Sequence, residues 1–76
     1  MEFQVVLSSF EQVQQFVAAA VRQPFDIRVG NERQHINGKD IMGMFSLDYT
    51  RPVRVCARCQ EEEFLRFRQE VAQFLV

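Results

Sequence analysis

Hydrophobic and polar residues alternate along this chain with two different periods, and each period predicts a kind of element. Helical spacing of three and four residues runs from Phe10 to Val21 and again from Phe64 to Leu75, which predicts two long amphipathic helices. The residues expected to face a core are Phe10, Val13, Phe16, Val17, Ala20 and Val21 in the first helix, and Phe64, Leu65, Phe67, Val71, Ala72, Phe74 and Leu75 in the second. Pro24 ends the first helix, and the acidic run Glu61–Glu63 favours the start of the second.

Short β-prone or alternating stretches at residues 3–7, 25–29, 33–37 and 53–57 predict four strands. With a short helix at 40–47 the order is β-α-β-β-α-β-α. Two long helices can then cover one face of a four-stranded antiparallel sheet, in an α+β open-faced sandwich. The other face would carry Gln4, Arg28, His35 and Arg54 to water. The alternative is a ferredoxin-like β-α-β-β-α-β domain in which residues 40–47 form only a loop.

Size and composition indicate a single domain over residues 1–76, because 47% of the residues are hydrophobic and eight of them are Phe. A formal net charge of −1 gives no electrostatic reason to expect nucleic acid or an anionic membrane as a partner. The longest hydrophobic run, Phe16–Val21, is far shorter than the ~20 residues of a membrane span. The N-terminus lacks a signal-peptide pattern, so a cytoplasmic protein is expected.

Cys56 and Cys59 form a single C-x-x-C pair, which could be half of a zinc site or a thiol redox motif. The only histidine, His35, is distant in sequence and sits in a polar hairpin, so we interpret it as an ordinary surface residue. The neighbouring carboxylates of Glu61–Glu63 would raise a thiol pKa, whereas a reactive thiolate needs a low one. We therefore expect two reduced structural cysteines, with no metal and no cofactor.

The segment 37–47, Asn-Gly-Lys-Asp-Ile-Met-Gly-Met-Phe-Ser-Leu, is the most distinctive part of the chain. Asp40 is placed to cap a short helix. Met42 and Phe45, three residues apart, would share one helical face, and methionine beside an aromatic ring makes an adaptable contact surface. The other interpretation is that these side chains fill the core, since a domain this small needs its hydrophobic residues.

This segment resembles the N-G-K-S-I-M-G-x-M-S-L pattern of HPr, the histidine phosphocarrier family of the bacterial phosphotransferase system, and the order of elements is similar too. The resemblance implies an HPr-like fold. It also implies that the short helix contacts a protein partner, a transcription regulator or a phosphotransferase-system component, through Ile41, Met42 and Phe45. Met44 and Leu47 would turn inward.

The chain departs from that family where the phosphorylated histidine opens the first helix, in a motif like G-x-H-A-R-P. The corresponding segment, Leu7-Ser8-Ser9-Phe10-Glu11-Gln12, holds no histidine, arginine or proline. The hydroxyls of Ser8 and Ser9 cannot replace imidazole in a phosphoryl relay, and Glu11 would repel an incoming phosphoryl group. His35 lies in the third predicted strand and cannot serve instead.

Asp40 occupies the position of a regulatory serine that a kinase phosphorylates in Gram-positive members of the family. Its charge either imitates the phosphorylated state or simply belongs to a good helix cap. The sequence thus predicts a protein that is not an enzyme but a regulatory or protein-binding module, similar to the catabolite-repression relatives in the family. The alternatives are a phosphocarrier with an unusual acceptor, a thiol oxidoreductase, and a structural part of a larger assembly.

Overall fold

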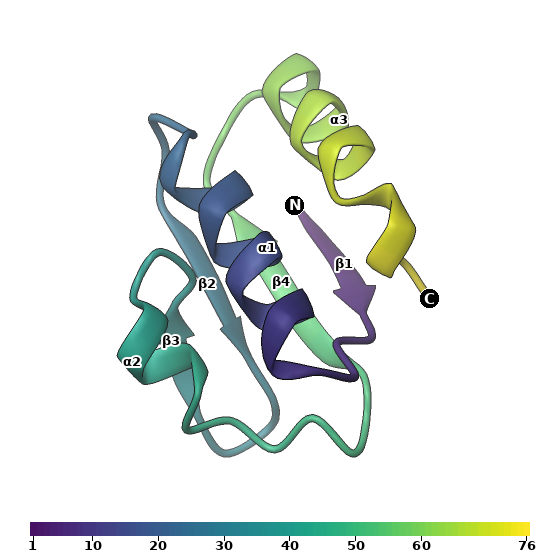
Figure 1. Ribbon diagram of the computed structural model, residues 1–76. Helices are drawn as coiled ribbons and strands as arrows, with labels where there is room; N and C mark the ends of the chain where they lie inside the picture. Colours follow the sequence, from purple (N-terminus) through teal and green to yellow (C-terminus); the bar gives the residue numbers. More distant parts are fainter.

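The computed structural model describes residues 1–76 as a four-stranded sheet with helices on one of its faces (Figure 1). In chain order the elements are β1 (Glu2–Val5), α1 (Phe10–Val21), β2 (Ile27–Gly30), β3 (His35–Asn37), α2 (Ile41–Met44), β4 (Val53–Ala57), α3 (Glu61–Glu70) and the 3-10 turn η1 (Ala72–Phe74). The predicted α+β open-faced sandwich is therefore confirmed. The alternative with only a loop at residues 40–47 is wrong, because α2 forms there.

The strands lie in the order β1-β4-β2-β3, and every neighbouring pair is antiparallel. The register aligns Phe3, Val55, Val29 and Ile36 in one row across the sheet, and these side chains point toward the helices. Because successive side chains in a strand alternate between faces, the next row faces the other way. As predicted, Gln4, Arg28, His35 and Arg54 are exposed on the uncovered face.

Both long helices pack on the same face of the sheet, and the core lies between the two layers (Figure 1). All six residues predicted to share that core are buried, namely Phe16, Val17, Ile27, Val55, Phe67 and Val71. The Phe67 ring is at its centre, with ring centroids 5.9 Å from Phe3, 5.9 Å from Phe16 and 6.0 Å from Phe25. Such edge-on and tilted arrangements are the ones aromatic rings prefer.

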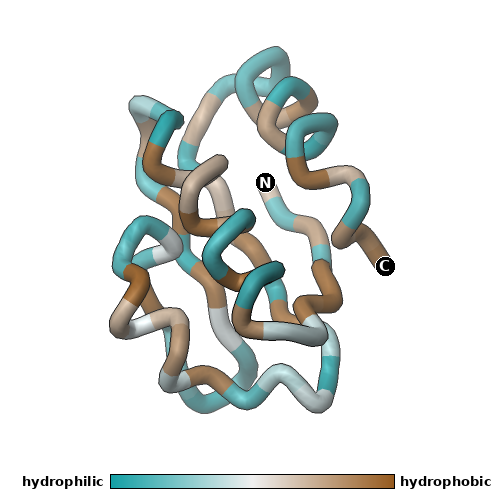
Figure 2. Tube along the Cα trace, in the orientation of Figure 1, coloured by the Kyte–Doolittle hydropathy of each residue, from teal (hydrophilic) through white to brown (hydrophobic).

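Four residues predicted to face the core are exposed instead, namely Phe10, Val21, Leu65 and Ala72. Phe10 and Val21, the first and last residues of α1, are 64% and 55% exposed. Both residues stand at the ends of the twelve-residue helix, whose buried residues all lie between them, namely Val13, Phe16, Val17, Ala19 and Ala20. Leu65 on α3 is 52% exposed, because fewer side chains of this helix face the core than its hydrophobic pattern predicted. The outer turns of α3 are accordingly mostly hydrophilic (Figure 2).

The end of the chain protects the outer edge of β1. After α3 and η1, Leu75 forms an antiparallel bridge with Val5. The Val6 N–H donates to the Phe74 carbonyl at 2.8 Å, and the Val76 N–H donates to the Gln4 carbonyl at 3.2 Å. These bonds satisfy backbone groups that an edge strand would otherwise leave open. None of the helices has the length and hydrophobicity needed to span a bilayer.

Replacing Phe67 by alanine should lower the free energy of unfolding by about 3–5 kcal/mol, because it removes a fully buried ring that contacts three others. Urea denaturation measures this change. Leu65→Ala on the same helix is the matched control and should cost less than about 0.5 kcal/mol, since Leu65 is exposed. Equal losses in the two variants would contradict the described core.

Candidate functional site

The short helix α2 begins at a side-chain cap. The Asp40 Oδ1 atom accepts a hydrogen bond from the Met42 N–H at 3.2 Å, which satisfies one of the free donors of the first turn. At the other end, the Ser46 hydroxyl donates to the Gly43 carbonyl at 2.6 Å. The cap predicted for Asp40 is thus present. With both ends bonded, a helix of four residues holds its side chains in fixed directions.

Gly43 explains how close α2 lies to the sheet. A Cβ atom at this position would lie 2.7 Å from Ile36 Cγ2 on β3 and 2.9 Å from Asp40 Oδ2. Both distances are shorter than van der Waals contact, so any side chain here would push the helix away from β3 and disturb its cap. The glycine therefore sets the helix against the edge of the sheet.

Within residues 41–47, some side chains face the core and others face water. Met44 and Leu47 are buried, as the resemblance implied, whereas Met42 is 76% exposed. Ile41 is half-buried against the core. A contact surface formed by Met42 and Phe45 implies that both are largely exposed, and for Phe45 this expectation is wrong, since its side chain is half-buried.

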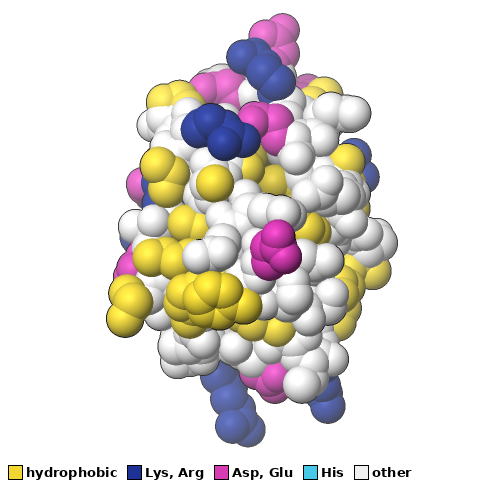
Figure 3. Space-filling model, in the orientation of Figure 1, with side chains coloured by type: hydrophobic (Ala, Val, Ile, Leu, Met, Phe, Trp, Pro, Cys, Tyr) yellow, Lys and Arg dark blue, Asp and Glu magenta, His cyan; other side chains and the backbone are white.

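The Phe45 ring is covered by Phe10, the first residue of α1. The two rings stack with centroids 4.3 Å apart and planes only 12° from parallel. Phe10 itself remains 64% exposed, so the stack has one face on the domain and one in water. We call the exposed surface of Phe10, Met42 and Phe45 the apolar patch. In Figure 3 hydrophobic side chains gather in one area over α2 and the start of α1.

A groove of about 460 Å³ adjoins this patch, between the start of α1 and the loop that follows α2. The hydrophobic residues that line the groove are Leu7, Phe10, Val13, Phe45 and Tyr49. The Tyr49 hydroxyl donates to the Met44 carbonyl, which ties the loop to α2, and burial raises the pKa of Tyr49 to about 12. The tyrosine therefore stays neutral and keeps this hydrogen bond at physiological pH.

The N-terminus of α1 is held by side-chain hydrogen bonds. Ser9 is the N-cap residue, and its hydroxyl accepts from the Gln12 N–H at 3.1 Å. The Gln12 side-chain oxygen in turn accepts from the Ser8 N–H at 2.8 Å and from the Ser8 hydroxyl at 3.0 Å. Glu11 is exposed in the first turn. Both serines are thus occupied in holding the helix end.

His35 lies on the other side of the sheet from this cap. Its neighbour Ile36 faces α2, and alternation along β3 directs the imidazole to the uncovered face. The histidine is exposed there, as predicted. It cannot join the groove at the start of α1.

The two cysteines are free thiols that are each half-buried. Burial raises the pKa of Cys56, and the Glu2 carboxylate raises it further. Burial likewise raises the pKa of Cys59, with a second contribution from the negative charge of Glu63. No group of three or more His, Cys, Asp and Glu side chains could hold a metal ion. The pair thus has the electrostatics of structural cysteines, not of a reactive dithiol.

Thiol reactivity should follow these pKa shifts. Because only the thiolate attacks, Cys56 in a Cys59→Ser variant should react with an aromatic disulfide more slowly than free cysteine at pH 7, and its rate should rise only above the usual thiol pKa. Glu2→Gln removes the neighbouring carboxylate, so it should speed the reaction at pH 8. A rate equal to or above that of free cysteine at pH 7 would contradict this.

Comparison with known proteins agrees with this architecture. No protein-family model matches the chain, and no curated protein matches it in sequence. Among solved structures it is similar to HPr-C-His from Thermoanaerobacter tengcongensis, with a TM-score of 0.75 and 21% identity over 96% of this chain and 92% of that one. The fold is that of HPr.

A second HPr-fold structure is the Bacillus subtilis catabolite-repression protein Crh, whose crystal structure revealed a domain-swapped, intertwined dimer. Its TM-score is 0.67, with 21% identity over 95% of this chain and 87% of that one. At this identity the likeness establishes the HPr fold alone.

The stack of Phe10 on Phe45 was not predicted from the sequence, because the two rings are 35 positions apart and belong to different elements.

Proposed function

We propose that this protein is an HPr-like module of the bacterial cytoplasm, related to the phosphotransferase system or its regulation, that binds a protein partner and carries no phosphoryl group. The observation that carries the proposal is the set of contacts at the N-terminus of α1. By the motif resemblance, Ser9 stands at the position of the phosphorylated histidine, and its hydroxyl is committed to the helix cap. The residue after it, Phe10, stacks on Phe45.

The chemistry of that site disfavours phosphoryl transfer. A relay needs a nucleophile whose phosphorylated form passes the group on readily, which imidazole provides and a serine ester does not. It also needs a positive group to stabilise the incoming charge. The exposed carboxylate of Glu11 stands in the first turn of α1 instead, at the position of the arginine in the family motif.

Docking is favoured because the same corner exposes hydrophobic surface that the core does not require. Met42 is 76% exposed and Phe10 is 64% exposed, and together with Phe45 they form the apolar patch beside a groove. A flexible methionine next to two rigid rings suits recognition of a partner's apolar side chain. The capping role accounts for Asp40, so the proposal does not require that its charge imitate a phosphoserine.

The docking proposal is tested with a variant that should lose partner binding without losing stability. Met42→Ser should leave the melting temperature unchanged, because the side chain is mostly in water, while capture of the partner from bacterial cytosol is lost. Loss of one anchor should weaken binding by about 2 kcal/mol or more. Leu65→Ser, which removes an exposed hydrophobic residue from α3, is the matched control and should retain the partner.

Phe45→Ser should both weaken capture and lower the melting temperature, because it removes the ring under Phe10. If Met42→Ser and Leu65→Ser capture the same protein equally well, the apolar patch is not the docking surface.

The absence of phosphoryl transfer is tested by intact mass. Neither phosphoenolpyruvate with the general phosphotransferase enzyme nor ATP with the HPr kinase should add phosphate. The reason is that Ser9 and Asp40 replace the two acceptors. Two gain-of-function variants keep this result informative. Asp40→Ser should become a substrate of the kinase, and Ser9→His with Glu11→Arg should accept phosphate from the general enzyme. A stable gain of one phosphate by the unmodified chain would refute the proposal and favour a phosphocarrier with an unusual acceptor.

A further inference from the structure

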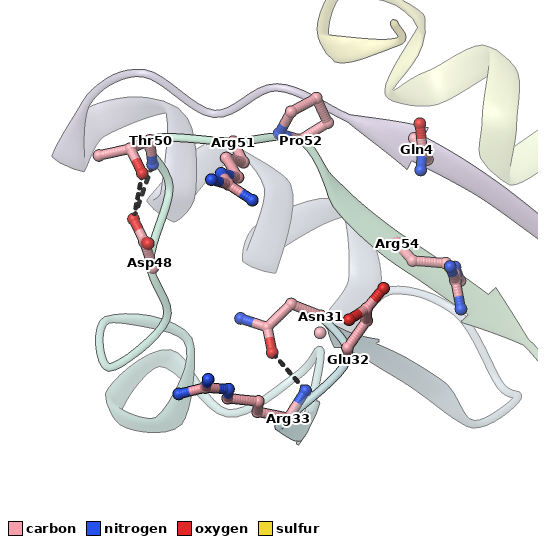
Figure 4. A pocket seen from close by; sticks show the side chains of 10 residues that line it. Gln4, Asn31, Glu32, Arg33, Asp48, Thr50, Arg51, Pro52 and Arg54 are labelled. Atoms are coloured by element: carbon pink, nitrogen blue, oxygen red, sulfur yellow. Dashed lines mark hydrogen bonds between the residues drawn. The ribbon is translucent and has the colours of Figure 1, made fainter.

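The loop that follows α2 has the apolar groove on one side and a second concave site on the other. The lining of this second site is polar. This hollow of about 590 Å³ is bordered by the β2–β3 turn, by residues 48–52 and by Arg54 of β4 (Figure 4). Apart from Pro52, every residue that lines it is polar, charged or glycine. A surface of this kind offers hydrogen bonds and charge to a ligand and almost no hydrophobic contact.

Three arginines from three separate segments line the hollow, and two of them are free of ion pairs. The only ion pairs of the molecule are Arg22 with Glu70 at 3.2 Å and Arg54 with Glu2 at 3.5 Å. Arg33 and Arg51 are exposed and have no such partner. Figure 4 shows the Arg51 guanidinium directed into the hollow from one side, while Arg33 borders it from the other.

The two turns that carry these arginines are held by side-chain hydrogen bonds. The Asn31 Oδ1 atom accepts from the Arg33 N–H at 2.8 Å and from the Gln34 N–H at 3.0 Å. The Asp48 Oδ1 atom accepts from the Thr50 N–H at 2.9 Å and from its hydroxyl at 2.6 Å. The backbone that positions Arg33 and Arg51 is therefore fixed before any ligand arrives, which reduces the entropic cost of binding.

The carboxylates of Asp48 and Glu32 also line the hollow, and they restrict what can bind. The hydrogen bonds from Thr50 lower the pKa of Asp48, with a smaller contribution from the charge of Arg51, so this group is ionised at neutral pH. Figure 4 shows it turned toward Thr50, away from Arg33. A simple polyanion would meet these negative charges, whereas a ligand with one anionic group and several hydroxyls would satisfy both kinds of lining.

We propose that the hollow between Arg33 and Arg51 binds a small phosphate ester that also carries hydroxyl groups. The phosphoryl group binds in the hollow, where the two unpaired guanidinium groups of its lining offer charge-assisted hydrogen bonds. The hydroxyls donate to the carboxylates, and they accept from the side-chain NH2 group of Asn31 on the rim. This site is separate from the apolar patch and does not depend on the function proposed above.

Ligand binding can be followed by the fluorescence of Tyr49. It is the only tyrosine of a chain without tryptophan, and it lies in the loop that carries Arg51. Glucose 6-phosphate is the probe, titrated at constant ionic strength while tyrosine fluorescence and backbone amide chemical shifts are recorded. We expect saturation with a dissociation constant on the order of 1 mM or tighter. The amides of residues 31–34 and 50–54 should move most, and inorganic phosphate should bind more weakly than the ester.

Variants decide whether the arginines are responsible. Arg33→Gln and Arg51→Gln should each weaken binding about tenfold, the effect of losing one charge-assisted contact, without changing the melting temperature. Arg22→Gln, on the helix face, is the matched control and should bind like the unmodified chain. The proposal is overturned if the response does not saturate, if glucose alone gives it, if inorganic phosphate binds more tightly than the ester, or if the double variant Arg33→Gln with Arg51→Gln retains it.

Discussion

The ring of Phe67 stands where α1, α3 and the sheet meet, and it contacts Phe3, Phe16 and Phe25 together. In a domain of 76 residues with free cysteines, this aromatic contact replaces the cross-links that small folds often need. The same contact places both long helices on one face of the sheet. Because the aromatic side chains of both helices converge on one face of the sheet, that face is covered and the other is left to water.

One-sided coverage leaves a corner that the two long helices do not reach, and α2 fills it. The helix can settle there because Gly43 allows close approach to Ile36, and because the Lys39 ammonium donates to the Gln23 carbonyl at 2.7 Å beyond the end of α1. Met44 then closes the core beneath it. What such a short helix cannot bury remains outside, so the apolar patch is the outer side of the element that completes the core.

Periodicity was sufficient to predict the element order and the shared core, because residues such as Phe16 and Val55 lie in the middle of their elements. It failed at the ends of α1, where Phe10 continues the hydrophobic stripe but is 64% exposed. The half-burial of Phe45 depends on that same ring. The polar hollow has no local signature either. Its unpaired arginines, Arg33 and Arg51, are 18 positions apart and line one hollow only because β3, α2 and the following loop fold between them.

The loop of residues 48–51 is a common wall between the two concave sites. Tyr49 lines the apolar groove and bonds to α2, Arg51 lines the polar hollow, and Thr50 borders both. The hydrogen bonds from Thr50 to Asp48 hold this loop in place, so the two sites share one ordered wall. A ligand that displaced this wall from one side would alter the other site, and by thermodynamic reciprocity any such coupling would be equal in both directions.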